Sequence, residues 1–262
     1  MNHCIFCGPT EAKITGEHLW GQWVSRVFRQ RGHRKYSARR HRTTSDPRRK
    51  DKDNRWISND INIFVKDVCR TCNDNTLSEL ENDVIKPLLE PLSAGIPHNL
   101  SIDDQFSLTA WIMRFAMVYE FADEKEQPKY FTQSEREQFI SEFTLPLPTH
   151  TWAWLAEYRG RVPIISAQRA LIALRPSPDD EPFLVMTGVA GRLVFQLLSR
   201  RWNKSPRAEL RRMTPIVKMW SPAVIRIWPE QPRGISWPPR KYLADDSIQA
   251  FIDRWSSLAP TN

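Results

Sequence analysis

The chain has 262 residues, of which 40% are hydrophobic and 11% aromatic, so it can build one large hydrophobic core or two modest ones. It contains no run of ~18 apolar residues, which argues against a membrane-crossing helix. The first residues contain neither a basic region nor an apolar one, so we expect no signal peptide, a cytoplasmic location and no membrane partner. The net charge of +8 favours a polyanionic partner.

The positive charge is concentrated in one stretch of the chain. Residues 26–55 contain thirteen Lys or Arg and three Asp, a larger surplus than that of the whole protein. Residues 29–55 hold almost no large apolar side chains, so we expect a mobile loop. Such a loop suits phosphate contacts that ignore nucleic-acid sequence, and a solvated linker without a ligand is the alternative. The densest basic run, and the expected nucleic-acid contacts, are Arg39, Arg40, Arg42, Arg48, Arg49 and Lys50.

We divide the chain into residues 1–95 and residues 96–262. In the first part, apolar residues alternate over residues 57–68, which predicts a strand. Apolar positions with helical spacing over residues 76–92 predict a helix that Pro87 kinks or breaks.

The second part combines helices with strands, so we expect an α+β architecture with antiparallel strands. Its first helix is expected over residues 103–122, where one apolar stripe repeats with helical spacing. The other expected elements are a helix from Thr132 or Ser134 to residue 143, strands at residues 150–158, 162–174, 183–189 and 224–228, a strand or helix at 191–201, and a last helix from Asp245 or Ser247 to about residue 258.

All four cysteines fall into two C-x-x-C pairs, Cys4 with Cys7 and Cys69 with Cys72. In a reducing compartment such pairs indicate a metal site rather than disulfides. Two pairs complete a tetrahedral Zn²⁺ site, and the 61 residues between them are acceptable because the entropy of loop closure grows only logarithmically with length. Four thiolates leave no open position, so this zinc would be structural. Four buried thiols with coincidental spacing are the alternative.

Three short motifs contain or adjoin these cysteines: CIFCG, EHLWGQW and CRTCNDNTLSELE. Together they resemble the HNH nuclease superfamily, and most closely its stand-alone bacterial members. The later segments LTAWIMRFAMVYEF, YFTQSEREQF, GRLVFQLLSRR, IWPEQP and SWPP resemble the same group. The resemblance implies a small ββα-metal fold stapled by zinc, followed by an α+β extension, and an endonuclease activity.

The resemblance also assigns roles to polar residues. His18 would take a proton from the attacking water, for which an imidazole with an ordinary pKa of about 6.5 is suited. Glu17 and Asn73 would supply oxygen ligands to a catalytic Mg²⁺ or Mn²⁺ ion at the scissile phosphate. Asn75 and Glu81 match the subgroup motif without a clear role, and the alternative for Glu81 is a salt bridge within the zinc knuckle. Plainer roles exist: Glu17 and His18 as a surface pair, and Asn73 as a helix N-cap.

Two positions depart from the family pattern. The acidic residue beside the histidine is more often Asp, and Glu17 is one methylene longer. The family's middle Asn lies about five residues before the third cysteine, where this chain has Phe64, so Asn62 is the nearest candidate to orient His18.

Four functions compete at this point. The first is a metal-dependent endonuclease that nicks or cleaves DNA; similar proteins serve in mobile elements, restriction or anti-phage defence, which adds a homodimer or a defence-system protein as an expected partner. The second is a non-catalytic, zinc-dependent nucleic-acid-binding protein, which would have no use for Glu17 and His18. The third is a ribonuclease or toxin-like effector with the same site. The fourth is a structural scaffold, which leaves the basic stretch unexplained.

Overall fold

The computed structural model describes residues 1–24, 36–42, 52–58, 63–122, 129–142, 150–161, 164–172, 183–200 and 207–255. Within these residues the protein is a mixed α+β structure, as the sequence predicts, and one large sheet lies at its centre. None of the described helices has the length and apolar character that crossing a membrane requires.

Seven strands form the large sheet: β4 (Tyr36–Arg42), β5 (Lys52–Ser58), β8 (His150–Glu157), β9 (Ile164–Ile172), β10 (Phe183–Gly191), β11 (Leu193–Arg200) and β12 (Val224–Trp228). They lie in the order β12-β8-β11-β10-β9-β4-β5. β4 runs parallel to β9, and the other neighbouring pairs are antiparallel. Gly191 has a φ of 61°, a left-handed value that costs glycine little and that turns β10 directly into β11.

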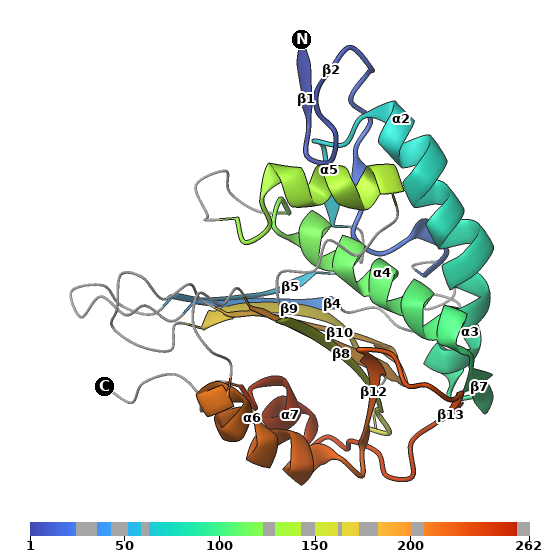
Figure 1. Ribbon diagram of the computed structural model, residues 1–262, viewed down its shortest axis with the longest axis vertical. Coiled ribbons are helices and arrows are strands. Elements are labelled where there is room, and N and C mark those ends of the chain that lie inside the picture. Colours follow the sequence, from blue (N-terminus) through green and yellow to red (C-terminus); the bar gives the residue numbers. More distant parts are fainter. Residues whose placement is uncertain are drawn as a thin grey trace.

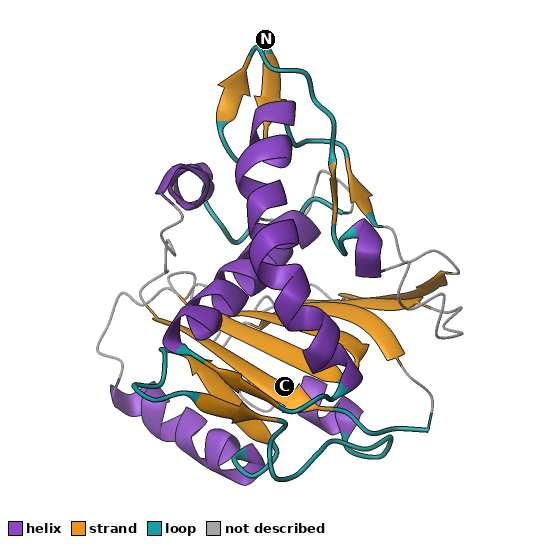
Figure 2. Ribbon diagram, turned by 90° about the vertical axis from the view of Figure 1, so that its right-hand side faces the viewer, coloured by secondary structure: helices purple, strands orange, loops and turns teal. Residues whose placement is uncertain are grey.

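Helices cover both faces of this sheet (Figures 1 and 2): α3 (Lys86–Ala94), α4 (Ile102–Tyr119) and α5 (Gln133–Glu142) lie on one side, and α6 (Arg207–Trp220) and α7 (Ile248–Ile252) on the other. Successive side chains of β10 point to opposite faces of the sheet and so pack against these two helical layers in turn. Leu184 and Met186 belong to the cluster that contains α4, whereas Phe183 and Val185 pack in the cluster that contains Met213 of α6. Every residue of β10 is buried for this reason.

The N-terminal part consists of two small antiparallel sheets and a long helical path. The strand pairs are β1 (Asn2–Cys4) with β2 (Gly8–Thr10), and β3 (Glu17–His18) with β6 (Phe64–Val65). The helical path is α2 (Arg70–Cys72), the π-helical η1 (Asn73–Leu77) and η2 (Leu80–Ile85), and then α3. It continues through Pro87, which lies in the first turn of α3. A further pair, β7 (His98–Leu100) with β13 (Ile235–Trp237), closes the far end of the molecule.

One hydrophobic core joins the N-terminal part to the large sheet. Trp20, which follows β3, is fully buried against Trp111 and Phe115 of α4 and Phe195 of β11. The ring centroids of Trp20 and Phe115 lie 4.6 Å apart in an edge-to-face arrangement, which aromatic pairs favour. α4 is therefore buried on almost all sides, between the sheet and the N-terminal part.

The expectation of a mobile loop throughout residues 29–55 is wrong for two segments. Residues 36–42 and 52–55 lie in β4 and β5, which pair with each other, and β4 also pairs with β9. Main-chain hydrogen bonds to an existing sheet form whatever the side chains are, so a polar composition did not reveal these strands. Residues 1–95 and 96–262 thus share one sheet and one core, and the boundary between them stays a prediction.

Candidate metal centre and adjoining cavity

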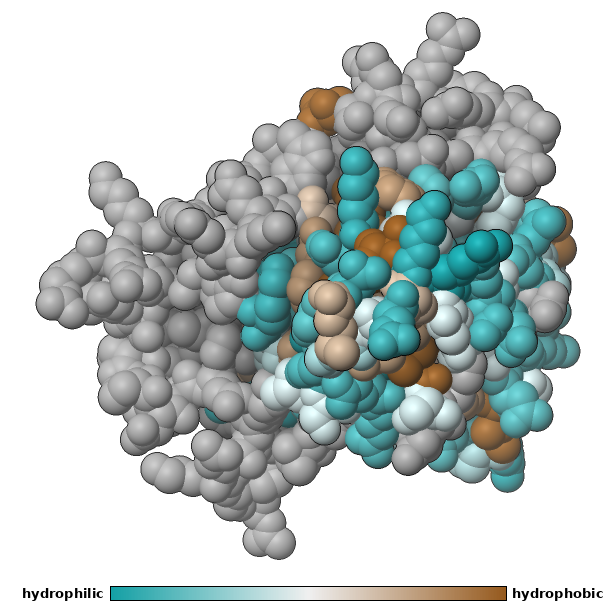
Figure 3. All heavy atoms as spheres, turned by 90° about the horizontal axis from the view of Figure 1, so that it is seen from above, coloured by the Kyte–Doolittle hydropathy of each residue, from teal (hydrophilic) through white to brown (hydrophobic). Residues whose placement is uncertain are grey.

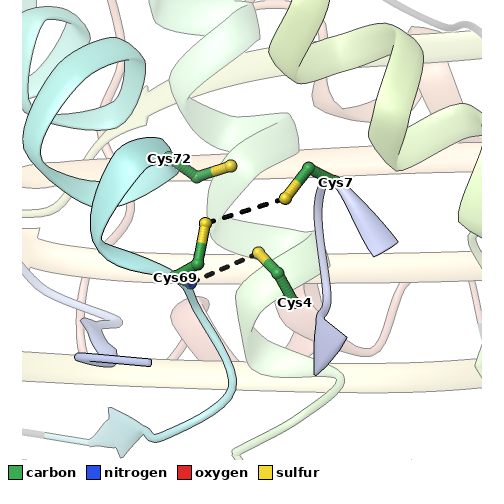
Figure 4. A group of neighbouring side chains, drawn as sticks. All are labelled: Cys4, Cys7, Cys69 and Cys72. Atoms are coloured by element: carbon green, nitrogen blue, oxygen red, sulfur yellow. Dashed lines mark hydrogen bonds between the residues drawn. The ribbon is translucent and has the colours of Figure 1, made fainter. Parts of the chain in front are cut away.

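The four cysteines converge on one point (Figure 4). Their sulfur atoms all lie within 4.8 Å of one another, and the Sγ atoms of Cys7 and Cys69 are 3.6 Å apart. A tetrahedral zinc ion with Zn–S bonds of about 2.3 Å holds its sulfur ligands ~3.8 Å apart. The expectation that the two motifs meet is confirmed, and the cluster can hold a structural metal ion such as zinc.

Local backbone geometry aims the first pair of thiols. Cys4 ends β1, and Cys7 follows in the turn that Gly8, with a φ of 73°, leads into β2. The main-chain N–H groups of Phe6 and Cys69 donate hydrogen bonds to Cys4 Sγ, with N···S distances of 3.4 and 3.3 Å. Such N–H donors stabilise a thiolate, which is the form that binds metal.

The electrostatics of the cluster also favour a cation. A hydrogen bond with Cys72, helped by the backbone N–H groups, lowers the pKa of Cys4 to about 4. Burial and the nearby Cys4 thiolate raise the pKa of Cys7 to about 12, and the hydrogen bond to Cys4 together with burial raises that of Cys72. The negative charge of the first thiolate disfavours the deprotonation of the neighbouring thiols. Four thiolates can therefore lie together only when a divalent cation is bound between them.

A cavity of about 300 Å³ adjoins the cysteine cluster. β3 contributes Glu17 and His18 to its wall, and the helical path after Cys72 contributes Asn73 and Glu81. These four residues come from two segments far apart in the sequence, which the cysteine cluster and the β3–β6 pairing bring together. The remaining wall residues are Gly21, Gln22, Trp23, Asp74, Leu77, Ser78, Asn82 and Lys86.

Asn73 ties the helical path to the strand that carries His18. Its Nδ2 donates a hydrogen bond to the carbonyl oxygen of Gly16 at 2.7 Å and another to Thr15 Oγ1 at 3.3 Å. Gly16 immediately precedes β3, so these bonds fix the start of that strand. The N-cap interpretation of Asn73 is wrong, because the helix begins at Arg70. With Nδ2 engaged, the amide oxygen is the atom available to a cation or a hydrogen-bond donor.

His18 lies directly opposite Phe64 in the pairing of β3 with β6. Their ring centroids are 4.8 Å apart, and His18 Nε2 lies 3.2 Å from Nε2 of Gln22. Phe64 occupies the position where the resemblance leads us to expect an asparagine, so an aromatic contact stands where a hydrogen bond was expected. Asn62, the predicted substitute, lies outside the described residues.

Arg114 of α4 reaches this site and pairs with two of its carboxylates, those of Glu17 and Glu81. Its Nη2 pairs with Glu17 Oε1 and lies 3.2 Å from Glu81 Oε2. The guanidinium also donates to the main chain, from Nη2 to the carbonyl oxygen of His18 at 2.8 Å and from Nη1 to that of Leu19 at 3.0 Å. Glu81 therefore forms a salt bridge, but its partner lies on α4 and not within the zinc knuckle, where it was expected. Sequence reasoning missed Arg114, although a single cation within an apolar helical stripe was the available signal.

Burial shifts the pKa values of the ionisable groups around Arg114. Burial raises the pKa of Glu81 to about 7, against the lowering effect of the hydrogen bond from Trp23 Nε1, which lies 3.2 Å from Glu81 Oε1. Burial also lowers the pKa of Arg114 to about 9. Burial is the larger of the two effects on the pKa of Glu81. Gly21 leaves room for this carboxylate, because a Cβ atom there would lie 1.5 Å from Glu81 Oε1.

The other predicted site residues lie away from the cavity or outside the described residues. Asn75 is exposed on η1 and does not line the cavity. Residues 48–50, with Arg48, Arg49 and Lys50, lie outside the described residues, whereas Arg39, Arg40 and Arg42 belong to β4. Seen from the end that carries β1 and β2, the described surface is mainly hydrophilic, and hydrophobic residues appear as separate patches (Figure 3).

Comparisons of this chain with family models, with curated proteins and with solved structures found no match. Membership of the HNH superfamily therefore stays a prediction that rests on the motifs. The donor set and the cavity are the observations on which a functional conclusion has to be built.

Proposed function

We propose that the cavity beside the cysteine cluster hydrolyses phosphodiester bonds in DNA with the help of a divalent cation. The observation that carries this proposal is that His18 and Asn73 line the same cavity, next to a site able to hold zinc. Three carboxylates, those of Glu17, Asp74 and Glu81, line it as well. A base, oxygen ligands and a metal-stapled scaffold are the parts that phosphodiester hydrolysis by an HNH-type site requires.

In this proposal His18 removes a proton from the attacking water. General-base catalysis by a positioned side chain contributes about 10²–10⁴ to a rate. The hydrogen bonds from Arg114 to the main chain at His18 and Leu19 hold the strand, and the ring of Phe64 supports the imidazole. The four cysteines act at a distance from the reaction, because the metal they hold fixes β3 relative to the helical path.

Asn73 and Glu17 are the proposed ligands of the second cation. Arg114 engages Glu17 through Oε1, which leaves Oε2 for the cation beside the amide oxygen of Asn73. Among the described residues, the cysteines are the one group of three or more Cys, His, Asp or Glu near enough to share a metal ion. Mg²⁺ tolerates such a sparse set, since it binds through one or two carboxylates and the substrate's phosphate. Bound there, Mg²⁺ or Mn²⁺ would stabilise charge on the scissile phosphate.

The basic residues 39–50 would hold the DNA backbone near this cavity by contacts that ignore sequence. Their chain position supports this role, because they lie between His18 and the second cysteine pair. The specific observation that favours the alternative, a non-catalytic nucleic-acid-binding protein, is the pairing of Arg114 with Glu17 and Glu81, which neutralises part of the negative charge that a cation needs.

One experiment separates these functions. Purified protein is incubated with supercoiled plasmid, and in parallel with RNA, in the presence of Mg²⁺, Mn²⁺ or EDTA. We expect metal-dependent nicking of the plasmid by wild type and by His98→Ala, a control on β7 outside the cavity, and its loss in His18→Ala. If wild type shifts the mobility of the plasmid but leaves it intact with either metal, the protein binds DNA without cutting it. Cleavage of RNA alone would make the substrate RNA.

A further inference from the structure

A second and larger cavity, of about 800 Å³, lies on the opposite face of the large sheet from α4. Its lining residues come from α6, from the strands β8 and β12, from the segment between β12 and β13, and from Arg254. Figure 1 shows where these helices and strands lie. Cavities of this volume fit a ligand the size of a nucleotide. Nothing in the proposed nuclease mechanism uses it.

The floor of this cavity is aromatic. Trp152 and Trp154 are two residues apart on β8, so their side chains leave the same face of the sheet. Trp154 is 3% exposed, and Trp152 is half-buried. Apolar residues of α6 and β12, such as Met213, complete this wall. Indole rings that border a cavity provide the flat, polarisable surface on which planar aromatic rings stack.

Among the described residues that line this cavity, the charged ones are all cationic. Lys218, Arg226 and Arg233 are exposed at its rim, and Arg254 is buried deeper. Among the described residues that line the cavity, none is Asp or Glu. The first cavity is different, since there Glu17 and Glu81 face Arg114. Four like charges around one cavity create an attractive field for an anion with more than one negative charge.

Two of these arginines are held in place. Arg254 packs over aromatic rings, with Cζ 5.0 Å from the centroid of Trp154 and 4.3 Å from that of Phe251. Arg226 donates to the side-chain oxygen of Gln231, with distances of 2.7 Å from Nε and 2.8 Å from Nη2. Because the Arg226 guanidinium is already oriented, the binding of an anion to it costs less side-chain entropy.

We propose that this cavity binds a nucleotide, with the base against the half-buried Trp152 and the phosphate at the cationic rim formed by Lys218, Arg226 and Arg233. The aromatic floor selects for a planar ring, and the four cations select for a phosphate over a single carboxylate. The nucleotide can be a free molecule or an unstacked unit of a nucleic-acid strand. The proposal holds whether or not His18 is catalytic.

The test is isothermal titration of the full-length His18→Ala variant with AMP, GMP, CMP and UMP, with adenosine, with inorganic phosphate and with a ten-residue oligothymidylate. We expect at least one mononucleotide or the oligonucleotide to bind, and binding to weaken at least tenfold in Arg226→Gln/Arg233→Gln. Both substitutions are at exposed positions, so folding should be retained. The control Arg240→Gln/Lys241→Gln removes two exposed cations outside the cavity and should bind as the parent does.

The two sources of the nucleotide give different results. Binding of a mononucleotide identifies a free ligand, and rim-dependent binding of the oligonucleotide alone identifies a unit within a strand. Trp152→Leu should weaken the binding of the same ligand, because this substitution removes a stacking surface and leaves the cationic rim unchanged. The proposal is overturned if no nucleotide binds more tightly than inorganic phosphate, or if the rim variant binds every ligand as tightly as the Arg240→Gln/Lys241→Gln control.

Discussion

Arg114 on α4 and Glu17 on β3 form an ion pair whose side chains are 1% and 9% exposed. The same guanidinium bonds the carbonyl oxygen of His18, so a helix from the second part of the chain holds the strand that carries the proposed base. The candidate site is therefore not confined to residues 1–95. Its carboxylates, its cation and its imidazole depend on the packing of α4 against the N-terminal part.

The raised pKa of Glu81 predicts a pH-dependent stability. The folded protein keeps the Glu81 proton up to about pH 7, whereas an unfolded carboxyl loses it near 4.5, so this contribution is complete below pH 4.5 and is lost as pH rises to 7. Glu81→Gln should remove this pH-dependent contribution. The difference in unfolding free energy between wild type and the variant should therefore change by up to about 3 kcal/mol between pH 4.5 and pH 7. Urea unfolding at a series of pH values measures this difference.

The matched control for this prediction is Glu79→Gln, an exposed carboxylate two residues earlier. Its pH profile should follow that of wild type. Parallel profiles for Glu81→Gln and wild type would show that Glu81 titrates in the folded protein as it does in the unfolded chain.

A methyl group at position 21 should disturb the cavity. The added Cβ would lie 1.5 Å from Glu81 Oε1 and 2.8 Å from Trp23 Nε1, and the hydrogen bond between these two groups leaves the carboxylate little freedom to move. Gly21→Ala should therefore lower the unfolding free energy by about 1–3 kcal/mol. The control is Gly234→Ala, whose Cβ would meet only Leu100 O at 3.4 Å. Equal thermal midpoints for the two variants would contradict the packing described here.

The cysteine cluster predicts about one zinc ion per chain by elemental analysis, as expected for a single four-thiolate site. Cys69→Ser should lose that zinc and much of the stability of the N-terminal part, because metal binding and folding are coupled. Thr71→Ser, an exposed position between the two cysteines of the same motif, should keep it. A wild-type protein without bound metal, or Cys69→Ser with a full complement, would rule out the centre.

The salt dependence of DNA binding tests the basic stretch. A protein that neutralises phosphates releases counterions, and each lost contact changes the slope of log K against log salt by about 0.9. Arg48→Gln/Arg49→Gln/Lys50→Gln should therefore flatten the slope by about 3, while Arg240→Gln/Lys241→Gln leaves it unchanged. Fluorescence anisotropy with a labelled duplex measures both slopes. An unchanged slope in the triple variant would remove these residues from the interface.

Elements with strong local signals could be predicted from the sequence. The apolar stripe of α4 and the short strand β12 lie where periodicity placed them. Thr132 caps α5 as predicted, since its Oγ1 accepts a hydrogen bond from the N–H of Glu135 at 3.2 Å. The ambiguous segment at residues 191–201 is the strand β11, because β8 and β10 lie on its two sides.

Elements that depend on tertiary context were missed. α6 contains Pro215, which is unfavourable within a helix, so no helix was expected over these residues. β4 and β5 are strands because they extend the sheet through β9 (Ile164–Ile172), which lies far along the chain. Local composition carries no information about such pairing.

In the candidate site, too, some residues carry a local signal in the sequence and others depend on tertiary contacts. Cysteine spacing and the short motifs pointed to the metal cluster and to His18 and Asn73, because ligand chemistry requires fixed residue types at fixed spacing. A single cation within an apolar stripe distinguishes Arg114 in the sequence, but its partners, and the role of Gly21, follow from which side chains the fold places within a few ångströms of Glu81.

The central claim, that His18 and Asn73 serve one catalytic site, is tested most directly by the single-turnover rate of plasmid nicking in wild type, His18→Ala, Asn73→Ala and the double variant at equal zinc content. Residues that act as a unit are strongly non-additive. We predict that each single variant slows nicking by at least about 10²-fold, as loss of a general base does, and that the double variant is no slower than the slower single one. Single variants that nick as fast as wild type, or a double variant whose loss equals the product of the two single losses, would contradict the account.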